Sequence, residues 1–211
     1  MKTYPLTLVL GGAASGKSEW AESLVHELGS RVWYLATALP GRAAARSPIW
    51  REKISRHRIR RPKSWRTFVL ADHRLPAFPP ERPHAILLDS LTLWVSARIS
   101  RSAAPSAGVS DPGRIGRSNG NHLREDLASL LAHLRSLAPL VIVSDEVGMG
   151  LTPITAVGRR FIEVLGRINA ATAAAADEVF WIVSGTPVQL KSSPHRRRLP
   201  ARGLSVSPTS R

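Results

Sequence analysis

Cysteine is absent from this chain of 211 residues. Without it there is no disulfide framework and no thiolate metal site, which suits a cytoplasmic enzyme. Long apolar runs are also absent: no stretch approaches the ~18 uncharged apolar residues of a membrane span. The apolar run near the N-terminus is too short for a signal peptide and leads into a glycine-rich segment that cleavage would destroy. We therefore expect a cytoplasmic protein without a membrane span.

Acidic residues are scarce as well, 15 against 30 lysines and arginines, which gives a net charge of +15. Such a charge raises the question of nucleic-acid binding. However, residues 191–211 carry six of the cations and no acid, and we predict a basic, disordered tail there, after one domain over residues 1–190. Because much of the charge lies in this tail, we do not expect nucleic acid to be the main partner.

The most informative segment is residues 7–28. Residues 11–18 fit G-x-x-x-x-G-K-[ST] at every fixed position, between a strand-like apolar run and apolar residues at helical spacing. The backbone N–H groups of such a loop surround phosphates, the lysine reaches the β- and γ-phosphates, and the hydroxyl of Ser18 can ligate Mg²⁺. A chance glycine-rich turn is the alternative, which the flanking elements disfavour. The predicted nucleotide site comprises Gly11, Gly12, Ala13, Ala14, Ser15, Gly16, Lys17 and Ser18.

Strand-like and helix-like segments alternate along the rest of the chain. We expect further strands over 31–37, 65–70, 85–89 and 140–144 and a last one over 178–183. Helices are expected over 47–58, 91–99, 122–137 and 155–176, with loops at 72–83 and 100–120. Strands that are apolar throughout indicate a mainly parallel sheet with helices on both faces. The predicted fold is therefore an α/β P-loop NTPase, RecA-like.

Polar residues gather where the predicted strands end. Asp89 ends the run 85–89 and is the best candidate for holding Mg²⁺ through water beside Ser18. Asp145 and Glu146, at the end of 140–144, compete for that role, and Glu146 is also a candidate for contact with a second substrate. An acid that only caps the following helix is the alternative for each of the three.

His57 lies among cations at positions 56, 58, 60, 61 and 63. Nearby positive charge disfavours imidazolium and keeps the ring neutral and nucleophilic, and the same cations can hold a triphosphate or a leaving pyrophosphate. On spacing alone the alternative stands, since a lone histidine in line with Trp50 and Ile54 is more often a packed side chain.

The chain resembles the bifunctional adenosylcobinamide kinase/adenosylcobinamide-phosphate guanylyltransferase family of cobalamin biosynthesis. The matching segments occur in family order, and the most distinctive are the histidine segment and SDEVGMGLTP. The segments are residues 11–18, 32–37, 54–67, 86–96, 144–153, 158–169 and 173–185.

The resemblance implies two reactions. In one, a nucleoside triphosphate, GTP or ATP, phosphorylates adenosylcobinamide with Mg²⁺. In the other, GTP guanylylates a histidine, which passes GMP to adenosylcobinamide phosphate and gives adenosylcobinamide-GDP. The resemblance places the guanylylated residue at His57, makes Lys17 catalytic, and implies a homotrimer. The nucleotide contacts that it implies beyond the phosphate loop are Ala36, Thr37, Ala38, Arg58, Ile59, Arg60, Arg61 and Asp89.

Several positions depart from the family pattern. Asp145 stands where an asparagine is common, and Ala170 replaces a usual glutamine. Ile154-Thr155 stands in place of Glu-Asn, and Val69-Leu70 occupies the place of an expected glutamate. These departures concern the cobinamide side and one nucleotide contact more than the phosphate loop. Two alternatives remain: a P-loop small-molecule or nucleotide kinase without a covalent histidine, and a RecA-like nucleic-acid-dependent ATPase.

Overall fold

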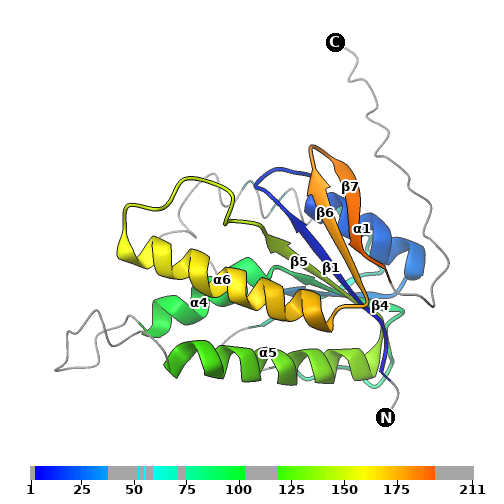
Figure 1. Cartoon of the computed structure of the whole chain (residues 1–211). Coiled ribbons are helices and arrows are strands. Elements are labelled where there is room, and N and C mark those ends of the chain that lie inside the picture. The colour runs from blue at the N-terminus through cyan, green and yellow to red at the C-terminus, as the bar shows by residue number, and fades with distance from the viewer. Residues whose placement is uncertain are drawn as a thin grey trace.

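Seven strands form a single sheet in the order β3–β2–β4–β5–β1–β6–β7 (Figure 1). The computed structural model describes residues 3–37, 52, 55, 59–70, 75–102 and 118–192, without the side chains of 100–102 and 118–121. All strand pairs are parallel except β6 with β7. The strands are β1 (Leu6–Gly11), β2 (Val32–Ala36), β3 (Arg66–Val69), β4 (Ala85–Asp89), β5 (Leu140–Asp145), β6 (Glu178–Val183) and β7 (Thr186–Lys191).

Helices cover both faces of this sheet, as the sequence predicts. Helix α1 (Lys17–Leu28) packs on one face, and α4 (Leu91–Ser102), α5 (Ser118–Leu137) and α6 (Ala156–Ala175) pack on the other (Figure 1). The strands feed both cores because successive side chains point to opposite faces. Leu8 and Leu10 thus join the core beneath α4, α5 and α6, while Val9 joins the core beneath α1. The α/β P-loop fold is confirmed.

The predicted helix over 155–176 agrees closely with α6. Thr155 is its N-cap, and the side-chain oxygen accepts a hydrogen bond from the Gly158 backbone N–H at 3.1 Å. A cap of this kind satisfies one of the backbone donors that the first helical turn leaves without a partner. None of the described helices is long and apolar enough to cross a membrane.

Two predictions about the connections are wrong. The loop expected over 100–120 is wrong at both ends, because α4 continues to Ser102 and α5 begins at Ser118, while 103–117 lie outside the described residues. The segment 178–183 is not the last strand, because β7 follows it and pairs antiparallel with β6. Turn residues at 184–185, with positive φ at both Ser184 and Gly185, close that hairpin.

Lys191, the first residue of the predicted tail, is the last residue of β7, and its ammonium donates to the carbonyls of Ala173 and Ala174 at 3.1 Å. Residues 193–211 lie outside the described residues. Of the helix predicted over 47–58, only Glu52 and Ser55 are described, and both are helical.

Replacing a buried leucine by alanine should destabilise the protein more than replacing an exposed one. Leu134 on α5 is fully buried, whereas Leu190 on β7 is 58% exposed. We expect Leu134→Ala to lower the free energy of unfolding by about 2–5 kcal/mol, since the lost contacts leave a cavity. The matched control, Leu190→Ala, should change it by less than about 0.5 kcal/mol. Urea denaturation followed by circular dichroism measures both, and equal losses would contradict the assigned core.

Candidate nucleotide-binding site

The phosphate loop connects β1 to α1 at the carboxyl edge of the sheet. Gly16 has φ 89°, in the left-handed region, and the first helical hydrogen bond runs from the Trp20 N–H to its carbonyl at 2.9 Å. A side chain at Gly11 would meet the Ile182 carbonyl oxygen at 2.9 Å, closer than a Cβ atom tolerates. Gly11 and Gly16 are therefore required by the path of the backbone.

Ser15 carries an unsatisfied polar group in this loop. Its hydroxyl oxygen is buried and has no hydrogen-bond partner among the described residues. Buried polar groups are nearly always paired, so an orphan in a loop of this shape indicates a place for a polar ligand. The backbone of Ser15 is held by the Gly185 N–H, which donates to its carbonyl at 2.9 Å and ties the β6–β7 turn to the loop.

Lys17 makes two polar contacts across the loop. Its ammonium donates to the Gly12 carbonyl at 3.1 Å and pairs with Asp145 Oδ1 at 2.6 Å. The side chains of Lys17 and Asp145 are 12% and 27% exposed, so water screens the pair only in part. Asp145 thus contacts the lysine that the motif assigns to phosphate binding.

Asp89 ends β4, which β5 separates from β1. Its Oδ2 accepts a hydrogen bond from the hydroxyl of Tyr34 at 2.6 Å. Because adjacent strands are about 4.8 Å apart, β1 and β4 lie about 10 Å from one another. This spacing leaves room for a hydrated cation between Asp89 and the Ser18 end of the phosphate loop.

Tyr34 is a buried residue of β2 that contacts both Asp89 and Arg61, and the sequence analysis missed it. Burial, and next the negative charge of Asp89, raise the pKa of this phenol far above its ordinary value of 10.0. The guanidinium of Arg61 lies over its ring, 3.3 Å from the centroid, a cation–π contact. The Arg61 Nε is buried without a hydrogen-bond partner among the described residues, a second orphan near the edge of the sheet.

Arg60 connects the segment that follows His57 to the phosphate-loop helix. It forms ion pairs with Glu19 and Glu22, one turn apart on α1, and its Nε lies 3.4 Å from Glu22 Oε2. These contacts are partly exposed and individually weak, but two carboxylates that pair with one guanidinium fix its orientation relative to α1. The chain that leads from the histidine is thereby anchored to α1.

Two other strand ends are joined to their neighbours. The hydroxyl of Thr37, after β2, donates to the Ser90 carbonyl at 2.7 Å and accepts from the Ser90 N–H at 2.8 Å. Thr37 is only 4% exposed, so its hydroxyl links the ends of β2 and β4. Glu146 donates its N–H to the Gly11 carbonyl at 3.0 Å, and its Oε1 accepts from the Gly148 N–H at 2.9 Å.

The sheet thus brings most of the predicted residues to one edge: the phosphate loop, Ala36, Thr37, Asp89 and Glu146. His57, Ala38 and Arg58 lie outside the described residues. Ile59 is 81% exposed, Arg60 contacts α1, and Arg61 contacts β2.

Besides Tyr34, the sequence analysis missed the acids that hold Arg60 and the buried Asn169 on α6. For Asn169 the only signal in the sequence is a polar residue in an apolar stretch of helix. Such a residue indicates that a hydrogen-bond partner exists, but not which one.

The family model and two relatives in sequence indicate the same family. The model of a family described as cobinamide kinase / cobinamide phosphate guanyltransferase matches residues 7–190. The bifunctional adenosylcobalamin biosynthesis protein CobP of Pseudomonas aeruginosa is 34% identical over 189 residues, 89% of this chain and 98% of that protein. The protein CobU of Escherichia coli, which has the same descriptive name, is 35% identical over 192 residues, 88% and 99% of the two chains. Among solved structures, the match with the RadB recombinase spans 93% of this chain and 86% of that chain, with a TM-score of 0.39 and 16% identity.

The buried phenol should make stability sensitive to alkaline pH. Because the pKa of Tyr34 is raised in the folded state, its contribution is complete below the ordinary value of 10.0 and is lost as the pH rises above it. The difference in unfolding free energy between the wild type and Tyr34→Phe should therefore fall by about 1.4 kcal/mol between about pH 8 and about pH 11. Urea denaturation at several pH values measures this difference, and a difference that does not vary with pH would contradict the buried, neutral phenol.

Proposed function

The chain belongs to the family of cobinamide kinases and cobinamide phosphate guanyltransferases, and we propose how its residues divide the two activities. It is an enzyme that phosphorylates cobinamide and guanylylates cobinamide phosphate, and its nucleotide substrates are GTP and ATP. The observation that carries our assignment is the phosphate loop at the carboxyl edge of the sheet, where Lys17 pairs with Asp145 of β5 and Asp89 ends the next strand, β4.

The phosphate loop, residues 11–18, binds the triphosphate in this proposal. Its backbone N–H groups and the α1 N-terminus attract phosphate oxygens, and the orphan hydroxyl of Ser15 gains a partner there. Lys17 stabilises the charge that develops on the transferred phosphoryl group. Further contacts come from the strand-end residues Ala36, Thr37 and Ala38 and from the segment Arg58, Ile59, Arg60 and Arg61.

Ser18 and Asp89 are the proposed protein contacts of Mg²⁺. No group of three or more metal-binding side chains occurs among residues the structure describes. That fits Mg²⁺, which keeps several waters and is held by one or two protein oxygens together with substrate phosphates. When bound, the ion neutralises charge on the phosphates. The hydrogen bond from the hydroxyl of Tyr34 would hold the Asp89 carboxylate in position for the hydrated ion.

His57 is the proposed nucleophile of the guanylyl transfer. Its neutral imidazole attacks the α-phosphorus of GTP, an N–P bond forms, the P–O bond to the β-phosphate breaks, and pyrophosphate leaves. A phosphate oxygen of cobinamide phosphate then attacks the same phosphorus and releases the histidine. Three residues of chain span at most about 11 Å. The anchoring of Arg60 to Glu19 and Glu22 therefore supports a nucleophile near α1.

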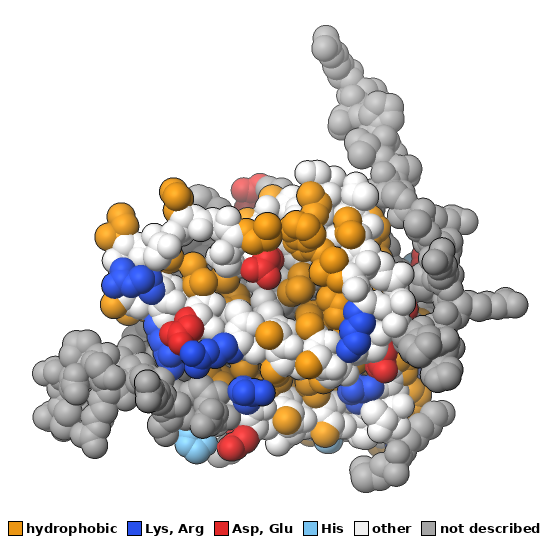
Figure 2. Space-filling view, viewed as in Figure 1, with side chains coloured by type: hydrophobic (Ala, Val, Ile, Leu, Met, Phe, Trp, Pro, Cys, Tyr) orange, Lys and Arg blue, Asp and Glu red, His pale blue; other side chains and the backbone are white. Residues whose placement is uncertain are grey.

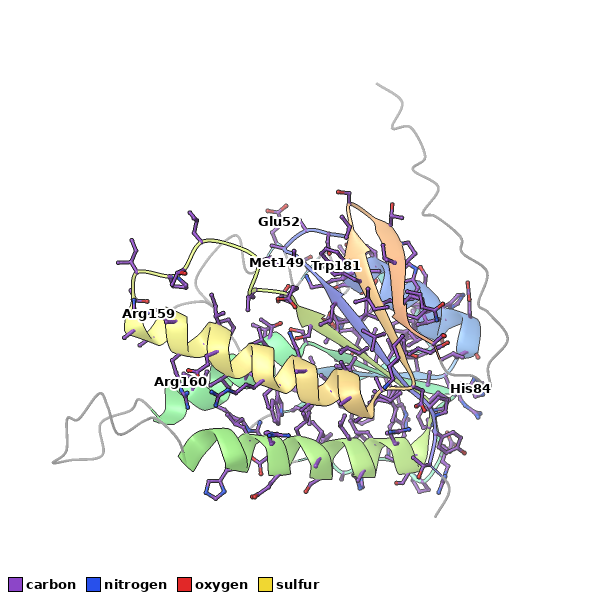
Figure 3. All side chains as sticks on the ribbon, viewed as in Figure 1. Glu52, His84, Met149, Arg159, Arg160 and Trp181 are labelled. Atoms are coloured by element: carbon purple, nitrogen blue, oxygen red, sulfur yellow. The ribbon has the colours of Figure 1, made fainter. Side chains whose placement is uncertain are left out.

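The loop between β5 and α6 is the proposed contact for the second substrate. Glu146 begins it, and Met149, Leu151 and Ile154 are 74%, 97% and 97% exposed. Figure 2 shows hydrophobic side chains projecting from this part of the surface, and Figure 3 places Met149 on the loop and Arg159 at the start of α6. Since the loop leaves the same strand end as Asp145, a corrinoid on it can present its hydroxyl group to the phosphate loop. We further propose a cytoplasmic location and a homotrimer.

Replacing the nucleophile should separate the two activities. With GTP labelled at the α-phosphate, the wild type should carry acid-labile, base-stable label, and His57→Ala should carry none while still phosphorylating cobinamide. His122→Ala, on the exposed face of α5, is the matched control and should be labelled normally. Lys17→Ala should lose both activities by a factor of about 10² or more. An unlabelled wild type would instead favour a plain P-loop kinase.

Substitutions in the β5–α6 loop should act on the corrinoid alone. Leu151→Ser and Ile154→Ser should each raise KM for cobinamide about tenfold, since each removes apolar surface that the substrate covers. The KM for GTP should stay within about twofold of the wild-type value. Val188→Ser, on the edge strand β7, controls for loss of an exposed apolar residue elsewhere. A parallel rise in KM for GTP would contradict a separate corrinoid surface.

A further inference from the structure

Lys17 is already engaged by the protein before any phosphate arrives. An ammonium group has three N–H donors, and the Gly12 carbonyl and the Asp145 carboxylate each accept from this one. The contact with Asp145, at 2.6 Å and only partly exposed, brings a full negative charge to the place where the motif needs a positive one. A nucleotide must therefore share Lys17 with this carboxylate or displace it.

The backbone of Asp145 is held on both sides, so the carboxylate stays beside Lys17. The Asp145 N–H donates to Thr92 Oγ1 of α4 at 2.8 Å, and the Asp145 carbonyl accepts from Asn169 Nδ2 of α6 at 3.0 Å. Asn169 is 5% exposed, and its Oδ1 accepts from the hydroxyl of Ser144 at 2.7 Å. Side chains of two helices thus fix the strand end, and only the torsions of the short Asp145 side chain remain free.

We propose that Asp145 sets the affinity of the phosphate loop by competing with phosphate for Lys17. The inference rests on the proposed function of this loop as the nucleotide site. A carboxylate beside the lysine weakens the attraction for every polyphosphate that the two reactions place in the loop. Substrates are then bound less tightly, and the diphosphate and pyrophosphate products leave more readily. Asp145 is accordingly a positioning residue that acts through Lys17.

Binding of inorganic tripolyphosphate to the full chain tests the proposal by isothermal titration calorimetry. Asp145→Asn keeps the size of the side chain and both backbone contacts of the residue. It should bind tripolyphosphate and GDP about three- to tenfold more tightly than the wild type. The gain should shrink as ionic strength rises from about 0.05 M to about 0.5 M, since salt screens the pair. An unchanged affinity would overturn the proposal, and a weaker affinity would overturn it and make the carboxylate a contributor to binding.

Two controls separate competition from other effects. Glu163→Gln on α6 removes one negative charge from an exposed ion-pair cluster with Arg160 and Arg167, and it should leave tripolyphosphate affinity unchanged. Asp145→Ala serves if Asp145→Asn does not fold, with folding judged by urea denaturation.

A double-mutant cycle with Lys17 shows whether Asp145 acts through the lysine. In Lys17→Ala, the further change Asp145→Asn should give less than half of its gain in the wild type. An equal gain would mean direct repulsion of phosphate and would overturn the proposed route. If Lys17→Ala alone binds tripolyphosphate as the wild type does, the nucleotide site itself lies elsewhere. That outcome refutes the proposed function and is thereby distinguished from a failure of the competition alone.

Discussion

The parallel register of β1 with β5 is the constraint on which the site depends. In this ladder Gly11 lies opposite Asp145, so the first residue of the phosphate loop and the last residue of β5 reach the edge of the sheet together. A slip of one residue would turn every side chain of a strand to the other face and would separate Lys17 from its partner. The two apolar cores make such a slip costly, because they fill both faces of the same strands. Packing of the interior therefore determines the electrostatics of the edge.

Cationic side chains near this edge contact acidic or aromatic side chains of the protein. Lys17 faces Asp145, Arg60 faces the acids of α1, and Arg61 lies over the ring of Tyr34, whose hydroxyl reaches Asp89. Three of the cations that the sequence assigned to phosphate, Lys17, Arg60 and Arg61, thus have a protein partner in the structure. In the proposed function one phosphate loop serves both reactions, so nucleotide products must leave it between them. Internal partners for Lys17, Arg60 and Arg61 favour that release, because each of these three cations is shared between the protein and the anion.

Apolar exposure adds a second chemical character to the same edge. The loop after β5 begins beside the phosphate loop and carries hydrophobic side chains into solvent (Figure 2). The proposed polar contacts for a triphosphate follow β1 and the proposed apolar contacts for a corrinoid follow β5, so the two loops leave neighbouring strand ends. This proximity suits a transfer between two large substrates, since both reacting groups must meet without a long movement of either.

The sequence by itself determined the strands and helices up to β6, the phosphate loop and the family. Local periodicity and short motifs with demanding backbone geometry specify these features. It placed Asp89 and Asp145 at strand ends but left open which of them serves the nucleotide. It missed β7, which follows the turn at residues 184–185 and is mostly exposed. Only the tertiary structure paired Lys17 with Asp145, Tyr34 with Asp89 and Arg60 with α1, across sequence separations of 128, 55 and 41 residues for the closest contacts. Such pairings depend on strand order and register, and no local pattern specifies them.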